Sequence, residues 1–256
     1  MLLGAPTAYW ATVAGRIGLA LGSFATVLAS RWPVGESLVS PRSHCTSCSR
    51  TLTPLELVPV VSWLAQRGRC RGCGGRVHWR DPAIELASGA LAAGAILTFG
   101  PTWEGLAAAL LGVALVPVTV IDLEHRLIPS IVVFPAAARY THQRSRSARI
   151  AAPRPRAAAA GAFAFFEVLR IVHPGGMGDG DGNLALLLGA VLGASIVPAL
   201  FIAFALGALL GVAFLARFGA RARKMAVPFG PFLATGALVA LWFGPSMIGW
   251  YADRLG

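Results

Sequence analysis

Charged side chains are scarce in this sequence. They make up 13% of its 256 residues, whereas a soluble domain normally carries about 25%. The apolar residues that take their place gather in blocks, each near the roughly 20 residues needed to cross a bilayer. The composition therefore excludes an ordinary soluble domain. It predicts an all-α polytopic membrane protein with about eight transmembrane helices.

The signatures of several familiar enzyme and ion-binding classes are also missing. The sequence contains no H-E-x-x-H, no G-x-S-x-G and no Walker loop, so it offers no support for the chemistries that these motifs identify. Asp179-Gly-Asp181-Gly-Asn183 resembles the start of a calcium loop. However, Leu184 replaces the required Gly and Ala190 stands where the bidentate Glu should be, so calcium binding is not predicted.

The few charges are mostly positive, with a formal net charge of +11. A basic chain can bind nucleic acid, but here the basic residues lie mostly in the connections between apolar blocks, the distribution that fixes membrane orientation. We therefore expect no nucleic-acid partner. We expect a multi-pass protein of the inner (plasma) membrane, embedded in the lipid bilayer, with the arginine-rich stretches 31–81 and 217–224 facing the cytoplasm.

The expected membrane helices follow the apolar blocks. They lie at about 8–30, 83–99, 104–121, 127–138, 157–172, 184–215 and 228–242, and the block 184–215 is long enough for two helices divided near Pro198. The apolar segment at about 8–30 is too long for the h-region of a signal peptide and follows no positively charged n-region, so the first helix, 1–30, should stay attached. With the N-terminus outside, the Asp-bearing turns at 122–126 and 174–182 fall on the same side as both basic stretches.

All four cysteines lie in the polar stretch 31–81. Cys45 and Cys48 form one C-x2-C pair, and Cys70 and Cys73 form the other. Four thiolates at this spacing can close a tetrahedral zinc site. Disulfides are the alternative, but a cytoplasmic loop is reducing. The site is expected to be structural, because four cysteines leave no open position for substrate, and metal would supply much of the folding energy of this loop.

Acidic residues number only 11, so an acid next to an apolar block is informative. Asp122 follows one such block, and Asp181 lies in a glycine-rich turn between two others. An ionisable group at a membrane boundary is a functional candidate by default, and a solvated interfacial charge is the alternative. Together the two carboxyls could share a proton, as carboxylate-catalysed peptide hydrolysis requires. The glycines around Asp181 would let backbone and substrate approach closely.

Several motifs resemble the prepilin (type IV leader) peptidase family, and they occur in family order over nearly the whole chain. Besides the cysteine pairs, they are Gly22-Ser-Phe-Ala-Thr26, Val58-Pro-Val-Val-Ser-Trp-Leu64, Arg67-Gly-Arg-Cys70, Ile121-Asp-Leu-Glu-His-Arg-Leu-Ile-Pro129, Gly176-Met-Gly-Asp-Gly-Asp181 and Pro228-Phe-Gly-Pro-Phe-Leu233.

The resemblance implies that Asp122 and Asp181 are the catalytic pair of a GxGD-type aspartic peptidase, with Gly178, Gly180 and Gly230 in substrate or active-site loops. The implied substrates are prepilins and pseudopilins of type IV pilus or type II secretion systems, cut after a Gly on the cytoplasmic side. The implied domains are a first helix at 1–30, a zinc loop at 31–81 and a peptidase domain at 82–256. In the family the loop is associated with N-methylation by S-adenosylmethionine, which here rests on the resemblance alone.

The sequence departs from the family pattern at two places. Asn183 stands where the family usually has Lys. The basic segment Arg139–Arg156 replaces an apolar helix, either as a divergent stretch or as the product of a shifted reading frame. Alternatively, 127–172 forms a re-entrant or interfacial element that does not cross the membrane. The competing hypotheses are a catalytically silent family member or assembly partner, and a zinc loop that binds pilin leaders without methylating them.

Overall fold

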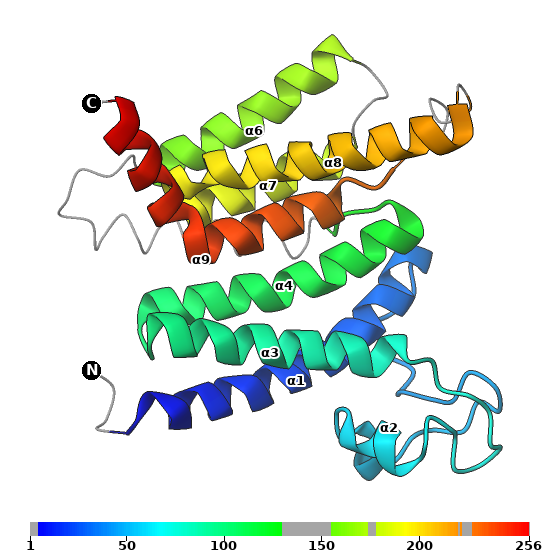
Figure 1. Cartoon of the computed structure of the whole chain (residues 1–256). Helices are drawn as coiled ribbons and strands as arrows, with labels where there is room; N and C mark the ends of the chain where they lie inside the picture. Colours follow the sequence, from blue (N-terminus) through cyan, green and yellow to red (C-terminus); the bar gives the residue numbers. More distant parts are fainter. Residues whose placement is uncertain (1–4, 130–154, 174–177, 220, 222–226, 256) are drawn as a thin grey trace. The chain divides into compact units, whose positions relative to one another are not determined.

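The computed structural model describes the chain except for residues 1–4, 130–154, 174–177, 220, 222–226 and 256. All regular elements in the described part are helices (Figure 1), which confirms the all-α prediction. The long helices are α1 (Thr7–Arg31), α3 (Arg80–Phe99), α4 (Trp103–His125), α6 (Pro155–Val172), α7 (Asp179–Leu192), α8 (Ile196–Phe218) and α9 (Gly230–Leu255). The short ones are η1 (Trp32–Val34), η2 (Pro54–Leu57), α2 (Val61–Ala65) and η3 (Gly193–Ser195).

Five helical stretches of the described chain are long and apolar enough to cross a membrane. They are Thr7–Val34, Arg80–Phe99, Trp103–His125, Gly180–Phe218 and Gly230–Arg254, and the fourth contains both α7 and α8. The expected total of about eight crossings stays a prediction. The expected helix at 127–138 and the basic segment at 139–156 lie largely outside the described residues.

The first of two compact units, Met1–Val120, is built on α1 and α3, which run antiparallel with glycines between them. A Cβ at Gly18 would lie 2.6 Å from the carbonyl oxygen of Ser88, and one at Gly22 would lie 2.7 Å from the Cα of Glu85. Only glycine permits such an approach, which is how membrane helices without a hydrophobic driving force gain van der Waals contact. α4 then returns along α3, with Gly112 against Leu91.

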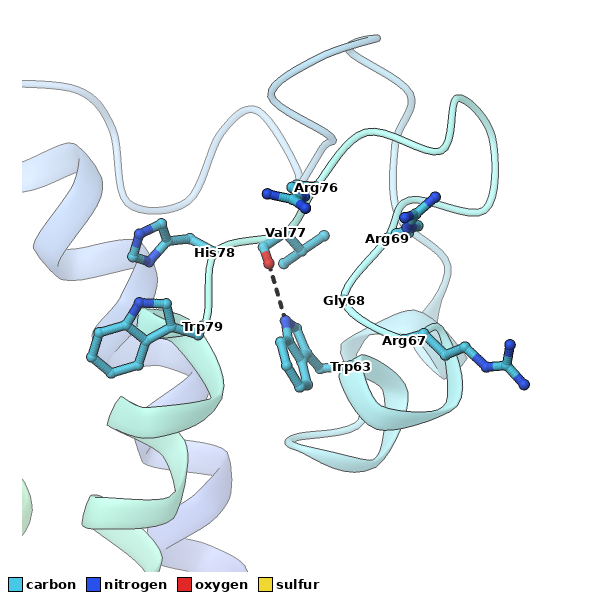
Figure 2. A pocket seen from close by; sticks show the side chains of 8 residues that line it. All are labelled: Trp63, Arg67, Gly68, Arg69, Arg76, Val77, His78 and Trp79. Atoms are coloured by element: carbon cyan, nitrogen blue, oxygen red, sulfur yellow. Dashed lines mark hydrogen bonds between the residues drawn. The ribbon is translucent and has the colours of Figure 1, made fainter.

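The polar loop between α1 and α3 is held by hydrogen bonds to α1 and by hydrogen bonds of its own. The buried Arg31 at the end of α1 donates hydrogen bonds to the carbonyl oxygens of Ser37 and Pro41, at 3.1 and 2.7 Å. Farther along the loop, the indole N–H of Trp63 in α2 donates to the carbonyl of Val77 at 3.2 Å (Figure 2). These bonds order a segment that has little apolar core of its own.

The second unit, Ile121–Gly256, contains the end of α4 and the helices α6 to α9. α6 packs on α7 where a Cβ at Gly189 would lie 2.6 Å from the carbonyl oxygen of Ala158. Phe166 of α6, Phe204 of α8 and Phe229 just before α9 form an aromatic cluster with ring centroids 5.1–6.2 Å apart. The cluster fixes the start of α9 against α6 and α8.

Both predicted Asp-bearing turns are helical in the structure. Asp122 lies within α4, because nothing between it and His125 breaks the helix, which ends where Arg126 takes a φ of 56°. Asp181 lies in the first turn of α7, whose N-cap is Gly178. The expectation of irregular turns at these two positions was therefore wrong.

Two other boundaries can be compared with the expected ones. The block 184–215 divides at Gly193–Ser195, close to Pro198 as expected, and Gly193 has a φ of 59° that favours glycine. Pro198 lies in the first turn of α8, where a missing N–H costs no helical hydrogen bond. The last helix runs on to Leu255, beyond the expected end at 242, and contains Pro245 within its length.

Candidate active site and metal centre

Asp122 is 5% exposed and lies near the C-terminal end of α4. Its carboxylate oxygen Oδ2 accepts a hydrogen bond from the backbone N–H of Gly230 at 2.7 Å. Gly230 begins α9, and the first N–H groups of a helix have no partner inside it. A Cβ at position 230 would lie 2.7 Å from the same oxygen. Glycine is therefore required for this contact.

Asp181 is 6% exposed and is the third residue of α7. Its Oδ2 accepts a hydrogen bond from the backbone N–H of Gly178, the residue that caps the same helix, at 3.2 Å. A negative charge in the first turn is favoured by the positive end of the helix dipole. The carboxyl group is thus held by its own helix and is shielded from solvent.

The structure brings the two aspartates into one neighbourhood of the second unit. The charge of Asp122 acts on the carboxyl group of Asp181, so the two groups lie within electrostatic range of each other. At Gly180 of α7, a Cβ would lie 2.6 Å from the Cβ of Ile128. Because Ile128 follows the end of α4 by three residues, α7 begins directly on the chain that leaves α4.

Sequence reasoning missed Glu85, a buried acid in α3. Its Oε2 accepts a hydrogen bond from the backbone N–H of Val60 at 2.7 Å, and Ser23 of α1 donates its hydroxyl to the same carboxylate. Val60 has a φ of 61°, an outlier for a β-branched residue. A signal was available, because an acid inside the apolar block at 83–99 is costly unless it has partners. Glu85 joins α1, the polar loop and α3.

The four cysteines form one cluster, with all four Sγ atoms within 4.8 Å of one another. The Sγ atoms of Cys45 and Cys73 are 3.9 Å apart. Zinc with Zn–S bonds of about 2.3 Å holds its tetrahedral sulfurs about 3.8 Å apart. The donor set and its spacing therefore fit a tetrahedral zinc ion.

The two C-x2-C knuckles repeat the same backbone design. The N–H of Cys45 donates to the carbonyl of Arg50 at 2.9 Å, and the N–H of Cys70 donates to that of Gly75 at 2.8 Å. The residue after the second cysteine of each knuckle has a positive φ, 57° at Ser49 and 72° at Gly74.

Backbone N–H groups also point at the sulfur atoms. The N–H of Ser47 donates to the Sγ of Cys45, and that of Gly72 donates to the Sγ of Cys70, both at 3.4 Å. Hydrogen bonds from the N–H groups of Cys73 and Gly72 are the main reason that the pKa of the Cys70 thiol falls to about 6. The backbone therefore favours the thiolate form at Cys45 and Cys70, and the thiolate is the form that binds metal.

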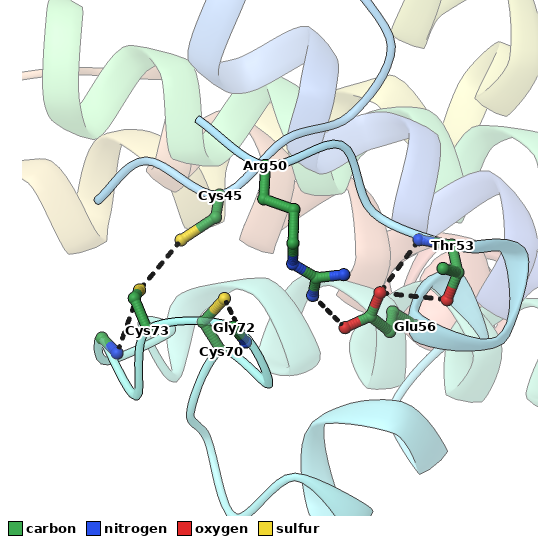
Figure 3. A network of polar contacts seen from close by, with 8 residues as sticks. Cys45, Arg50, Thr53, Glu56, Cys70, Gly72 and Cys73 are labelled. Atoms are coloured by element: carbon green, nitrogen blue, oxygen red, sulfur yellow. Dashed lines mark hydrogen bonds and ion pairs between the residues drawn. The ribbon is translucent and has the colours of Figure 1, made fainter. Parts of the chain in front are cut away.

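An ion pair lies directly beside the cluster. Arg50 donates from Nη2 to the Oε1 of Glu56 at 2.5 Å, and Figure 3 shows its guanidinium between Glu56 and Cys70. The Arg50 hydrogen bond, followed by the one from the N–H of Thr53, lowers the pKa of Glu56 to about 2. The arginine places a positive charge next to sulfurs that would carry net negative charge even with zinc bound.

Comparison with known proteins assigns this chain to a family. Residues 17–99 match the Bacterial Peptidase A24 N-terminal domain, and residues 109–215 match the Type IV leader peptidase family. A Bacillus subtilis (strain 168) protein named Prepilin leader peptidase/N-methyltransferase is 37% identical over 243 residues, which are 91% of this chain and 94% of that protein. A Burkholderia pseudomallei (strain 1026b) protein of the same name is 35% identical over 278 residues, 93% of this chain and 87% of that protein.

The chain belongs to the type IV leader peptidase family. The resemblance drawn from the motifs is thereby confirmed, and the chain is a peptidase and a membrane protein. The peptidase match includes Asp122 and Asp181, and the N-terminal match includes the four cysteines. No solved structure matches the chain.

The relatives are also named as N-methyltransferases, an activity that needs a methyl donor such as S-adenosylmethionine. S-adenosylmethionine carries a sulfonium cation and an ammonium group, which carboxylates and aromatic rings attract. The pocket beside the second knuckle contains two tryptophans, Trp63 and Trp79, but also three arginines and no carboxylate. The arginines could pair with the carboxylate of that cofactor and the indoles with its sulfonium, but the lining has no carboxylate for its ammonium group, so no residue is assigned to the cofactor.

Proposed function

We propose that the chain cleaves prepilins or pseudopilins after a Gly residue, with Asp122 and Asp181 as its catalytic pair. The observation that supports this most is that both carboxyl groups are buried where the start of α7 packs on the chain that leaves α4. The ionised aspartate would activate a water molecule, and the protonated one would donate to the carbonyl oxygen of the scissile bond.

The three glycines that contact this site fit the same proposal. Gly178 and Gly230 donate backbone N–H groups to the two carboxylates, and Gly180 packs on Ile128. A Cβ at Gly180 or Gly230 would lie 2.6 Å from Ile128 or 2.7 Å from Asp122, so a larger residue at either position would disturb the site.

Cleavage is proposed to occur on the cytoplasmic side. The arginine-rich loop precedes α3, and α4 returns antiparallel to α3 and carries Asp122 near its end. If both helices cross the membrane, Asp122 lies on the same side of the membrane as the arginine-rich loop. Arginine-rich loops favour the cytoplasm.

Zinc is proposed as a structural ion held by Cys45, Cys48, Cys70 and Cys73. The four sulfurs lie within 4.8 Å of one another and would complete a tetrahedral shell, which would leave no position for a substrate or for a catalytic water. The ion would fix the two knuckles to each other and so order the polar loop.

N-methylation of the newly exposed residue is proposed as a second activity, supported by the names of the relatives. The test is incubation of membranes with a cleaved pilin and labelled S-adenosylmethionine. Label on the pilin N-terminus is expected, and binding of the pilin without label would favour a leader-binding loop instead.

The peptidase proposal is tested by cleavage of a prepilin in membranes that contain Asp122→Asn or Asp181→Asn. Both variants are expected to lose cleavage by at least about 1000-fold, because the unit that removes and donates the proton is broken. Glu124→Gln is the matched control, since it removes an exposed carboxylate two residues from Asp122. Normal cleavage by either Asn variant, at equal protein level, would refute the proposal.

A further inference from the structure

A pocket of about 410 Å³ lies beside the second cysteine knuckle, within the first unit. Its volume is in the range of small-ligand sites. Its lining includes the indoles of Trp63 and Trp79, the cations Arg69 and Arg76, and the imidazole of His78, and none of its lining residues carries a carboxylate. Figure 2 shows His78 next to Trp79, with ring centroids 5.7 Å apart.

The frame of this pocket is held by its own backbone. The N–H of Gly68 donates to the carbonyl of Trp63 at 2.9 Å, and the N–H of Val77 donates to the carbonyl of Gly68 at 2.8 Å. The Trp63 indole N–H closes the ring by donating to the carbonyl of Val77. Gly68 has a φ of 65°, and a Cβ there would lie 2.9 Å from the Trp63 ring. The pocket is therefore preformed.

The pocket has hydrogen-bond donors and positive charge but lacks an acidic partner. Arg69 and Arg76 face each other in an antiparallel β-bridge, where like charges opposite each other are destabilising. In the described part of the chain, no ion pair joins either one to a carboxylate. The Nδ1 of His78 accepts the N–H of Arg80 at 3.1 Å, so its Nε2 is left as a donor. An anion would complete this arrangement.

The pocket also lies where a membrane helix begins. Trp79 is 67% exposed and directly precedes α3, a candidate span. Exposed tryptophan at the end of a span is typical of the level of the lipid headgroups. Val61 and Leu64 of α2 are 62% and 61% exposed. Since successive residues of a helix are about 100° apart, both side chains lie on the face of α2 away from Trp63. Anionic groups at this level belong mainly to phospholipids.

We infer that this pocket binds the phosphate group of an anionic phospholipid, such as phosphatidylglycerol, in the leaflet on the side of the polar loop. Arg69 and Arg76 donate to the phosphate oxygens, His78 adds a further donor, and the indoles pack against the glycerol and upper acyl chain. Guanidinium groups suit phosphate because their N–H groups match its oxygens in pairs. The inference is independent of the peptidase proposal.

The test is native mass spectrometry of the detergent-purified full chain, titrated with phosphatidylglycerol or with phosphatidylcholine. Wild type should bind one phosphatidylglycerol with preference over phosphatidylcholine. Arg69→Gln with Arg76→Gln should weaken phosphatidylglycerol binding by about tenfold or more. The matched control, Arg42→Gln with Arg71→Gln, removes two exposed arginines of the same loop that do not line the pocket and should change binding less than about twofold.

An equal loss in both double variants would show diffuse surface attraction and overturn the inference, as would no loss in either. Displacement of the lipid by millimolar inorganic phosphate would overturn the claim that the bound phosphate belongs to a lipid. Displacement by S-adenosylmethionine would overturn the claim that the pocket binds a phosphate group. Zinc content and melting temperature report whether each variant is folded. If the pocket double variant does not fold, the single variants Arg69→Gln and Arg76→Gln carry the test, each with an expected loss of about threefold or more.

Discussion

Gly230 shows how a residue without a side chain can define a catalytic geometry. Its N–H is the hydrogen-bond partner of the Asp122 carboxylate, and the space of its missing Cβ is occupied by that carboxylate. The same position begins α9, so the contact links the orientation of the aspartate to the placement of a whole helix. A substitution at 230 should therefore act through Asp122.

Gly230→Ala is expected to lower the rate of prepilin cleavage at saturating substrate by about tenfold or more, because a hydrogen bond to a charged group contributes about 1.5–3 kcal/mol. Gly249→Ala on the same helix is the control, since a Cβ there meets nothing within 4 Å. Rates should be measured in membranes with matched protein levels. An unchanged rate for Gly230→Ala, or an equal loss for Gly249→Ala, would show that the contact has no catalytic role.

At the scale of elements, the two cysteine knuckles and the pair of α1 with α3 hold the first unit together.

Cys70→Ser is expected to reduce bound zinc from about one ion per chain to well below half, because a three-sulfur site loses its closed shell. Ser49→Gly is the control: it removes the strain of a positive φ of 57° without touching a sulfur. The measurement is elemental analysis of purified protein. Full zinc in Cys70→Ser would contradict the proposed ligand set.

The pairing of α1 with α3 makes a separate prediction. Gly22→Ala should lower the free energy of unfolding by about 1–3 kcal/mol, because its Cβ would meet the backbone of Glu85 at 2.7 Å and force the helices apart. Gly15→Ala should have little effect, since its Cβ would lie at an ordinary 3.4 Å from that of Ala93. Denaturant titration in detergent compares the two variants. Equal free energies of unfolding for the two variants would mean that α1 and α3 can move apart without loss of stability.

At the scale of the whole molecule, the sequence was enough for the helical class, the family and the four-cysteine cluster. Each of these depends on a local signal: the length of an apolar block, or the spacing of cysteines within a knuckle. The helical setting of Asp122 and Asp181 was not predicted, because polar and glycine-rich residues after an apolar block look like a turn. What keeps these segments helical is capping and packing, such as the N–H of Gly178 on Asp181 and the contact of Gly180 with Ile128.

The role of Glu85 was also not predicted, although its position inside an apolar block was visible. Its partners are the backbone of Val60, which adopts an unusual φ, and the hydroxyl of Ser23 on another helix. Sequence patterns show where an acid lies, but they do not show which distant backbone group satisfies it. The same limit applies to the arginine-lined pocket, whose arginines oppose each other only once the second knuckle has formed.

The central claim is that Asp122 and Asp181 act as one unit, and a double-mutant cycle on the cleavage rate tests it most directly. Groups that share a proton are strongly non-additive, so Asp122→Asn, Asp181→Asn and the double variant should all fall to about the same residual rate. The rates should be measured on one prepilin in membranes, with mass spectrometry of the product to locate the cut after Gly. If the losses of the single variants multiply in the double variant, the two carboxyl groups act independently and the account is wrong.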